Sequence, residues 1–308
     1  MIEIKHILCP VDFSDCSRRA FDRAVAVARR YGSQITVLHV LPVASAVPAV
    51  PYGPFGPAPF GVETVDREGA MAKLPRFLAV EPSTDIPVRY EVAEAPSVHK
   101  EVLLQTARRS ADLVVMGTHG RSGFDRLLLG SAAEKTLRTS LVPVLIVPPH
   151  TPDAVRAGRD PFERILHATD FSDASARALR YAASFAQHPG AQLTLVHVIE
   201  PLPVGYDPLV GVTFSDEAAA DESAKTQLRQ LVPTAVTAGC ETATVVTRGK
   251  PYAEILRVAT ERRADLIVLG VHGRGALDRL VFGSTTEHIV RRATCPVLTV
   301  RDDEHPQG

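Results

Sequence analysis

Short apolar runs alternate with longer segments of helical periodicity along the whole chain. In the first half this pattern predicts strands at about 4–9, 34–40, 86–92, 112–116 and 143–147, with helices near 15–31, 63–79, 97–109 and 131–139. The strands are rich in Val, Ile and Leu and show little polar alternation, which is typical of a parallel sheet buried on both faces. Helices between parallel strands form right-handed crossovers. The pattern therefore predicts a doubly wound α/β fold.

The second half repeats this pattern. Its expected strands lie at about 162–168, 191–198, 241–247, 265–269 and 296–300. Residues 7–14 match residues 165–172 at an offset of 158, whereas residues 143–147 match residues 296–300 at an offset of 153. The second copy therefore carries a net deletion in its middle. We expect two tandem domains, at 1–148 and 162–303, joined by a linker at 149–161.

The most informative repeat is a glycine-containing loop that follows the fourth strand of each half. Residues 111–131 and 264–284 are identical at 13 of 21 positions and share the skeleton Gly-x-x-Gly-x9-Gly-Ser. Glycines allow backbone N–H groups to approach a ligand closely, and a helix N-terminus favours an anion. The sequence thus predicts a phosphate-binding loop in each half, built from Gly117, Gly120, Gly130 and Ser131 and from Gly270, Gly273, Gly283 and Ser284.

A structural alternative exists for the same residues. Ser131 and Ser284 each stand three residues before a glutamate, Glu134 and Glu287, and Ser-x-x-Glu is the capping box of a helix start. In that case the serines only cap and the glycines only make turns. Both roles can coexist, because a cap satisfies only some of the free N–H groups of the first helical turn.

Other candidate side chains lie beside the loops. Asp12 and Asp170 close the first strand of each half, where a carboxylate could bind a ribose hydroxyl or an adenine amino group, or could begin the next helix. His119 and His272 could act as general bases or bond backbone, and Arg121 and Arg274 could bind phosphates or remain solvated. His39 and His197 alternate with apolar residues in a strand, which favours core or rim histidines over metal ligands. We expect no metal-binding cluster of side chains.

Composition narrows the possible partners. The chain has 308 residues, of which 45% are hydrophobic and 22% charged, and its 34 basic and 35 acidic residues nearly cancel. This balance provides no electrostatic footprint for nucleic acid or an anionic membrane. No apolar run approaches the roughly 18 residues of a membrane span, and the N-terminus does not resemble a signal peptide. The scattered Cys9, Cys16, Cys240 and Cys295 form no metal or disulfide framework, which favours a reducing cytoplasm.

Two stretches crowded with proline and glycine, at 42–61 and 201–211, interrupt the pattern after the second strand of each half. The carboxyl end of such a strand is where α/β proteins bind ligands. These stretches are therefore either flaps near the sites or exposed insertions without function.

These motifs resemble the universal stress protein family, and in particular its tandem members. The resemblance covers about 2–148 and 162–302 and rests, in each half, on the first strand ending in Asp-Phe-Ser, the Gly-x-x-Gly-x9-Gly-Ser loop and the final Pro-Val strand. It implies two Rossmann-like domains, each with a five-stranded parallel sheet in order 3-2-1-4-5 and helices on both faces. It also implies that the halves pack through their last strands as an intramolecular pseudo-dimer, and that two chains associate further as a homodimer.

The loop is the signature of ATP-binding members of this family. The resemblance therefore implies ATP with bridging Mg²⁺, and nucleotide contacts from Asp12, Val40, Met116, Gly117, His119, Gly120, Arg121, Gly130, Ser131 and Ala132. In the second half the same roles fall to Asp170, Val198, Leu269, Gly270, His272, Gly273, Arg274, Gly283, Ser284 and Thr285. One departure is visible: the family's Gly-x-Pro after the third strand is present at 249–251, whereas the first half has Glu94-Ala95-Pro96.

Three functions remain in view. The leading hypothesis is a cytoplasmic, nucleotide-dependent regulator of the stress response with an unknown protein partner. The second is a slow ATPase or phosphotransferase, with Asp12, His119, Asp170 and His272 as candidates, although neither loop contains the Gly-Lys-Ser/Thr of a P-loop. The third is an interaction scaffold in which only one half binds nucleotide. We assign no catalytic residues.

Overall fold

The computed structural model describes residues 2–43, 66–78, 86–118, 129–151, 161–200, 215–231, 239–271 and 283–301. The strands of the first half are β1 (His6–Pro10), β2 (Gln34–Pro42), β3 (Val88–Ala95), β4 (Leu113–Gly117) and β5 (Val144–Val147). Its helices are α1 (Asp15–Tyr31), α2 (Arg67–Leu78), α3 (Val98–Arg108) and α4 (Ser131–Thr139). Each falls where the hydrophobic pattern predicts it.

The second half repeats the same order of elements. Its strands are β6 (Arg164–Ala168), β7 (Gln192–Ile199), β8 (Glu241–Arg248), β9 (Leu266–Gly270) and β10 (Val297–Val300). Its helices are α5 (Asp173–Phe185), α6 (Ser215–Leu231), α8 (Pro251–Glu261) and α9 (Ser284–Arg292).

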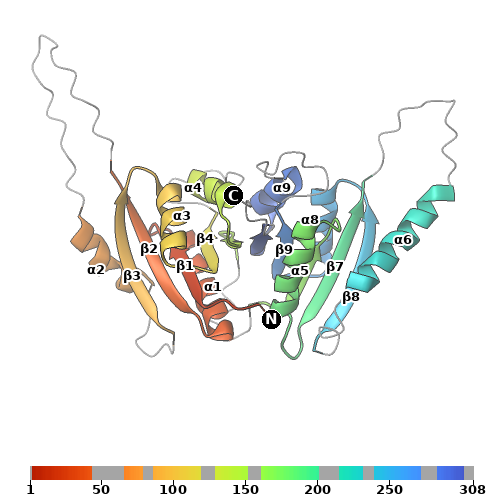
Figure 1. Ribbon diagram of the computed structural model, residues 1–308, viewed down its shortest axis with the longest axis horizontal. Helices are drawn as coiled ribbons and strands as arrows, with labels where there is room; N and C mark the ends of the chain where they lie inside the picture. Colours follow the sequence, from red (N-terminus) through yellow and green to blue (C-terminus); the bar gives the residue numbers. More distant parts are fainter. Residues whose placement is uncertain are drawn as a thin grey trace, which may run out of the picture.

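The ten strands of the described residues form one sheet, in the order β3-β2-β1-β4-β5-β10-β9-β6-β7-β8. Within each half the strands are parallel and follow the predicted order 3-2-1-4-5. The halves meet where β5 and β10 pair antiparallel, with Leu298 opposite Leu145. The Thr299 hydroxyl also donates to the Val144 carbonyl at 3.2 Å. The expected packing through the last strands is confirmed, and Figure 1 shows the halves side by side with α2 and α6 at the two outer ends.

Helices cover both faces of the sheet, as a doubly wound fold requires. Apolar residues of α1, α2, α5 and α6 join one buried cluster, and those of α3, α4, α8 and α9 join the other. Successive strand residues alternate between the clusters: Ile7 and Cys9 lie in the first, and Leu8 lies in the second. Each cluster includes side chains from both halves, so the core is continuous across the β5–β10 seam.

Helices also join the halves on the α1–α5 side. The Tyr31 hydroxyl lies 2.8 Å from the Ser184 hydroxyl, and the Tyr31 ring packs edge-on against Phe185 with 5.6 Å between centroids. Arg23, only 4% exposed, donates to the Pro161 carbonyl at 3.2 Å. The seam therefore consists of strand pairing and helix packing together.

Some expectations fall outside these elements. The proline- and glycine-rich stretches lie almost wholly outside the described residues, as does most of the linker, so the domain boundaries stay predictions. The four cysteines are free thiols. Among the helices that the structure describes, none is both long enough and apolar enough to cross a membrane.

Candidate functional site

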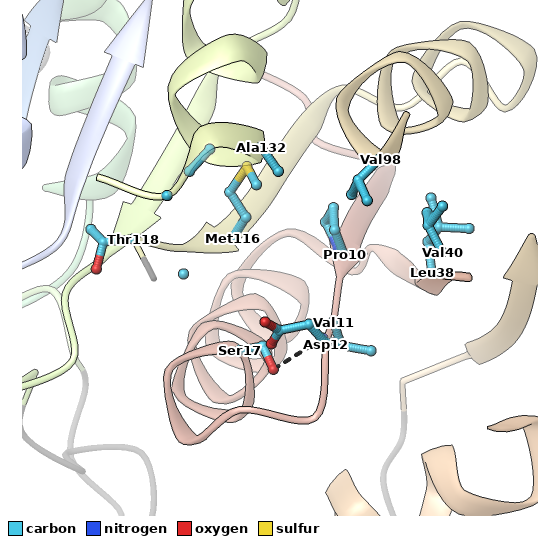
Figure 2. A pocket seen from close by; sticks show the side chains of 13 residues that line it. Pro10, Val11, Asp12, Ser17, Leu38, Val40, Val98, Met116, Thr118 and Ala132 are labelled. Atoms are coloured by element: carbon cyan, nitrogen blue, oxygen red, sulfur yellow. Dashed lines mark hydrogen bonds between the residues drawn. The ribbon is translucent and has the colours of Figure 1, made fainter. Parts of the chain in front are cut away.

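A pocket opens at the carboxyl edge of the first half, where β1 and β4 lie side by side but their following helices lie on opposite faces. Such a switch in topology is where open α/β sheets bind ligands. Its lining consists of Pro10, Val11, Asp12, Ser17, Leu38, Val40, Val98, Met116, Gly117, Thr118, Gly130, Ala132 and Ala133. Figure 2 shows the Asp12 carboxylate on one side of this pocket and the apolar side chains of Val40 and Met116 on others.

Asp12 is held by the turn between β1 and α1. Its Oδ1 accepts from the Ser14 backbone N–H at 3.1 Å and from the Ser14 hydroxyl at 2.6 Å. Phe13 between them has φ 62°, a left-handed conformation that is rare for a bulky residue and marks a built turn. The N-cap of α1 is Ser14, so the alternative that Asp12 begins the helix is wrong.

The second half builds the same turn. Asp170 Oδ1 accepts from the Ser172 N–H at 3.1 Å and from its hydroxyl at 2.6 Å, and Phe171 again has φ 62°. Ser172 caps α5 as Ser14 caps α1. Two copies of an unusual backbone geometry indicate that the turn serves the same purpose in both halves.

A histidine on the neighbouring strand supports each turn. His39 Nδ1 lies 2.8 Å from the Val11 carbonyl, and His197 Nδ1 lies 2.8 Å from the Thr169 carbonyl. The rings contact Phe13 and Phe171 at centroid distances of 4.6 and 4.4 Å. Both are thus hydrogen-bonded rim histidines, as predicted, and each fixes the backbone that carries the aspartate.

The glycines that end β4 and β9 have a packing role that the loop motif did not predict. A Cβ on Gly117 would lie 2.7 Å from Cys16 Sγ, and one on Gly270 would lie 2.8 Å from the Ala174 carbonyl carbon. Glycine here lets the first turn of α1 or α5 approach the strand. We expected close approach of a ligand; at these two positions the close neighbour is the protein's own helix.

The capping-box interpretation of Ser131 and Ser284 is wrong. α4 begins at Ser131 itself, and its N-cap is Gly130, which has no side chain to cap the helix. α9 likewise begins at Ser284 with Gly283 as its uncapped N-cap. The reason is that the Gly130 N–H donates to the Thr118 carbonyl at 2.7 Å, while the Gly130 carbonyl accepts from the Glu134 N–H at 2.9 Å. The N-cap position is therefore taken one residue earlier.

The structure brings most of the predicted first-half residues together. Asp12, Val40, Met116, Gly117, Gly130 and Ala132 all line the pocket, and Ser131 stands between two of them at the start of α4. Their second-half counterparts lie at the ends of β6, β7 and β9 and at the start of α9: Asp170, Val198, Leu269, Gly270, Gly283, Ser284 and Thr285. Outside the described residues lie His119, Gly120, Arg121, His272, Gly273 and Arg274.

Sequence reasoning missed the remaining pocket residues. These are Pro10, Val11, Ser17, Leu38, Val98, Thr118 and Ala133. For Ser17 a signal existed, because Ser175 repeats it at the same offset as the Asp-Phe-Ser turns. The Ser17 hydroxyl accepts from the Asp12 N–H at 3.3 Å, drawn dashed in Figure 2. In the part of the chain that the structure describes, no cluster of three or more His, Cys, Asp or Glu side chains could hold a metal ion.

Comparison with known proteins matches both halves to one family. The model of the universal stress protein family matches residues 3–148 and 161–301. A universal stress protein of Thermus aquaticus is 36% identical over 140 residues, which is 99% of its own length and 46% of this chain. One from Mycolicibacterium smegmatis is 30% identical over 214 residues, covering 66% of this chain and 67% of that protein.

A solved structure shares the full architecture. The universal stress protein from Archaeoglobus fulgidus DSM 4304 aligns over 98% of both chains with a TM-score of 0.65 and 24% identity, a likeness of fold. Together with the family matches to each half, these findings show that the chain belongs to the universal stress protein family, with two family domains in tandem.

Proposed function

We propose that this protein binds ATP in each half and acts as a nucleotide-dependent regulator of the stress response. The observation that carries the proposal is the first-half pocket. There a carboxylate, two apolar side chains and an uncapped helix N-terminus line one hollow at the switch point of the sheet. An adenine nucleotide needs these three kinds of surface.

The apolar side of the pocket suits the base. Val40 and Met116 are 7% and 6% exposed and come from β2 and β4. An adenine ring would lie against them, because flat apolar groups gain free energy by leaving water. The Asp12 carboxylate can accept hydrogen bonds from ribose hydroxyls or the adenine amino group.

The start of α4 suits the phosphates. The first N–H groups of a helix lack intrahelical partners, and the helix dipole places partial positive charge there. Because the N-cap of α4 is a glycine, which has no capping side chain, the N–H groups at Ser131 and Ala132 and the Ser131 hydroxyl are suited to phosphate oxygens. His119, Gly120 and Arg121, which lie outside the described residues, stay predicted phosphate contacts.

The site could hold Mg²⁺ with a single carboxylate from the protein. Mg²⁺ prefers phosphate oxygens and water, with one or two carboxylates from the protein. Asp12 is the carboxylate among the pocket-lining residues. When bound, Mg²⁺ would neutralise phosphate charge, while Asp12 would orient the nucleotide from the protein side.

The second half supports a second site. Asp170 keeps the geometry of Asp12, and α9 begins without a side-chain cap as α4 does. The apolar positions are occupied by Val198 and Leu269. We therefore expect two nucleotides per chain.

The first test is to purify the chain without added nucleotide, denature it, and quantify any released adenine nucleotide, followed by titration with Mg-ATP. Two nucleotides per chain are expected. One per chain would support the interaction scaffold with a single working site. No release and no binding would refute the proposal and leave the glycines and serines as turns and helix starts.

A matched pair of variants tests the assigned contacts. Asp12→Asn keeps an oxygen for the Ser14 bonds but removes the charge, so ATP affinity of the first half should fall by about tenfold or more. Asp170→Asn should do the same in the second half. Glu261→Gln, an exposed change on α8, is the control and should leave both affinities unchanged. Equal affinity in all proteins would remove Asp12 and Asp170 from the site.

A further inference from the structure

A closed ring of four charged side chains joins the two halves directly behind the phosphate ends of the two candidate sites. It consists of Glu134 and Arg138 on α4 and Glu287 and Arg291 on α9, and we call it the α4–α9 ring. In Figure 1 these two helices lie on either side of the middle of the molecule. We propose that the α4–α9 ring couples the two nucleotide sites, so that occupation of one weakens binding at the other. This inference rests on the proposed function.

The ring is closed because every member bonds both of its neighbours. Arg138 Nη2 lies 3.1 Å from Glu134 Oε1 and 3.1 Å from Glu287 Oε2. Arg291 Nη2 lies 3.0 Å from Glu287 Oε1 and 3.3 Å from Glu134 Oε2. Thus one oxygen of each carboxylate pairs with the arginine on its own helix, and the other oxygen pairs with the arginine of the opposite half. Each glutamate therefore pairs with one arginine of its own half and one arginine of the other half.

The ring lies close to where phosphates would bind. Gly130 and Ala133 line the pocket, and Glu134 follows Ala133 directly and donates its N–H to the Gly130 carbonyl at 2.9 Å. Glu287 has the same relation to Gly283, at 3.0 Å. A phosphate at either helix start would therefore stand within about one helical turn of a carboxylate, where like charges repel.

Because the two halves share both arginines, the coupling between the nucleotide sites is negative. A phosphate beside Glu134 adds negative charge to the first-half side of the ring and draws the guanidinium groups of Arg138 and Arg291 toward it. The bonds to Glu287 then weaken, and its carboxylate is less well neutralised. A second phosphate at the start of α9 would meet that charge, so its binding is less favourable. By linkage the effect is the same in either order of filling.

The size of the coupling depends on how far the four charged side chains are exposed to solvent. The four side chains are 25–37% exposed, so water and salt screen their charges substantially. Ion pairs at this degree of exposure contribute little, so we expect a coupling of about threefold in affinity at low salt.

The test compares the stepwise dissociation constants of the intact chain for Mg-ATP, measured by native mass spectrometry at low salt. The ring variant combines Glu134→Gln, Arg138→Gln, Glu287→Gln and Arg291→Gln, which leaves the net charge unchanged and alters both halves equally. The ratio of second to first constant should fall by about threefold relative to the unaltered chain. A control with Arg257→Gln and Glu261→Gln breaks an exposed ion pair on α8 and should keep the original ratio.

A second variant guards against misfolding of the first. Glu134→Asp with Glu287→Asp keeps all charges but shortens the carboxylates, and it should change the ratio in the same direction. An unchanged ratio in both variants, or a single nucleotide per chain, would overturn the coupling while leaving nucleotide binding in place. Absence of any bound nucleotide would instead refute the proposed function.

Discussion

His167 is a buried histidine whose charge state limits the stability of the protein at low pH. It lies in β6 with 0% exposure, its Nδ1 is 3.2 Å from the Val268 carbonyl, and among the described residues its Nε2 finds no hydrogen-bond partner. Burial lowers the pKa of His167 from 6.5 to about 4. The folded protein therefore keeps this imidazole neutral at pH values where the unfolded chain binds a proton.

The sign of the pH effect follows from that difference. Above pH 6.5 both states are neutral at His167, and as pH falls toward 4 the unfolded state gains stability by protonation. The loss approaches about 3 kcal/mol for a shift of this size. Burial raises the pKa of Asp265 to about 6, which acts in the opposite direction over a similar range, so a variant is needed to separate them.

We predict that His167→Cys, which introduces the residue found at the equivalent Cys9, removes this pH dependence. Urea unfolding at several pH values between 7 and 4 should show that the unaltered chain loses more stability than the variant, by about 3 kcal/mol. Any cavity cost in the variant is independent of pH. Parallel pH profiles for the two proteins would contradict the prediction.

Individual residues show where sequence reasoning succeeds. The role of His39 could be predicted, because a polar ring alternating with apolar residues must find a partner at the sheet rim. The role of Ser131 could not, because the choice of N-cap depends on the hydrogen bond between Gly130 and Thr118, which lie far apart in the sequence. A residue whose role depends on a hydrogen bond to a distant part of the backbone cannot be assigned from the local spacing of residue types.

Strands and helices follow the hydrophobic pattern closely, and their ends deviate for identifiable reasons. β3 was expected at 86–92 but runs to Ala95, because its pairing with β2 continues until Pro42 lies opposite Ala95. Apolar patterning marks which residues are buried, whereas strand pairing decides where a strand ends. Thr118 and Val98 line the pocket but could not be predicted, because the packing of elements, and not the local sequence, brings them to the site.

The close contact between β4 and α1 gives a prediction about one element pair. Gly117→Ala should destabilise the chain by about 1–3 kcal/mol, because the new Cβ meets Cys16 Sγ. Adding Cys16→Ala removes that atom and should recover part of the loss. Thermal unfolding of the single and double variants measures this.

The second half supplies the control for that experiment. Gly270→Ala meets backbone atoms of Ala174 and Ser175 at 2.8 and 2.9 Å, so shortening a side chain there cannot relieve the contact. Ala174→Gly should therefore fail to rescue it. Equal rescue in both halves would show that the contact with Cys16 Sγ is not the cause.

At the scale of the whole molecule, the ten-stranded sheet and its continuous cores should make the two halves unfold together. Each buried cluster contains residues of both halves, and β5, β10, α1 and α5 all contribute to the seam. We predict one calorimetric transition with a ratio of calorimetric to van't Hoff enthalpy of about 1. Two resolved transitions, or a ratio of about 2, would show that the halves are independent.

The antiparallel pairing of β5 with β10 also bears on how the two copies diverge. In a symmetric dimer of identical chains, each contact between two residues occurs twice, because both chains use the same surface. Every substitution at the interface therefore also occurs twice. Here the seam always joins one copy to the other, and the Thr299 hydroxyl bonds Val144 without any need for the reverse contact. Covalent fusion therefore frees each copy to accumulate substitutions of its own. The differences at Cys9 and His167, and at Cys16 and Ala174, illustrate this freedom.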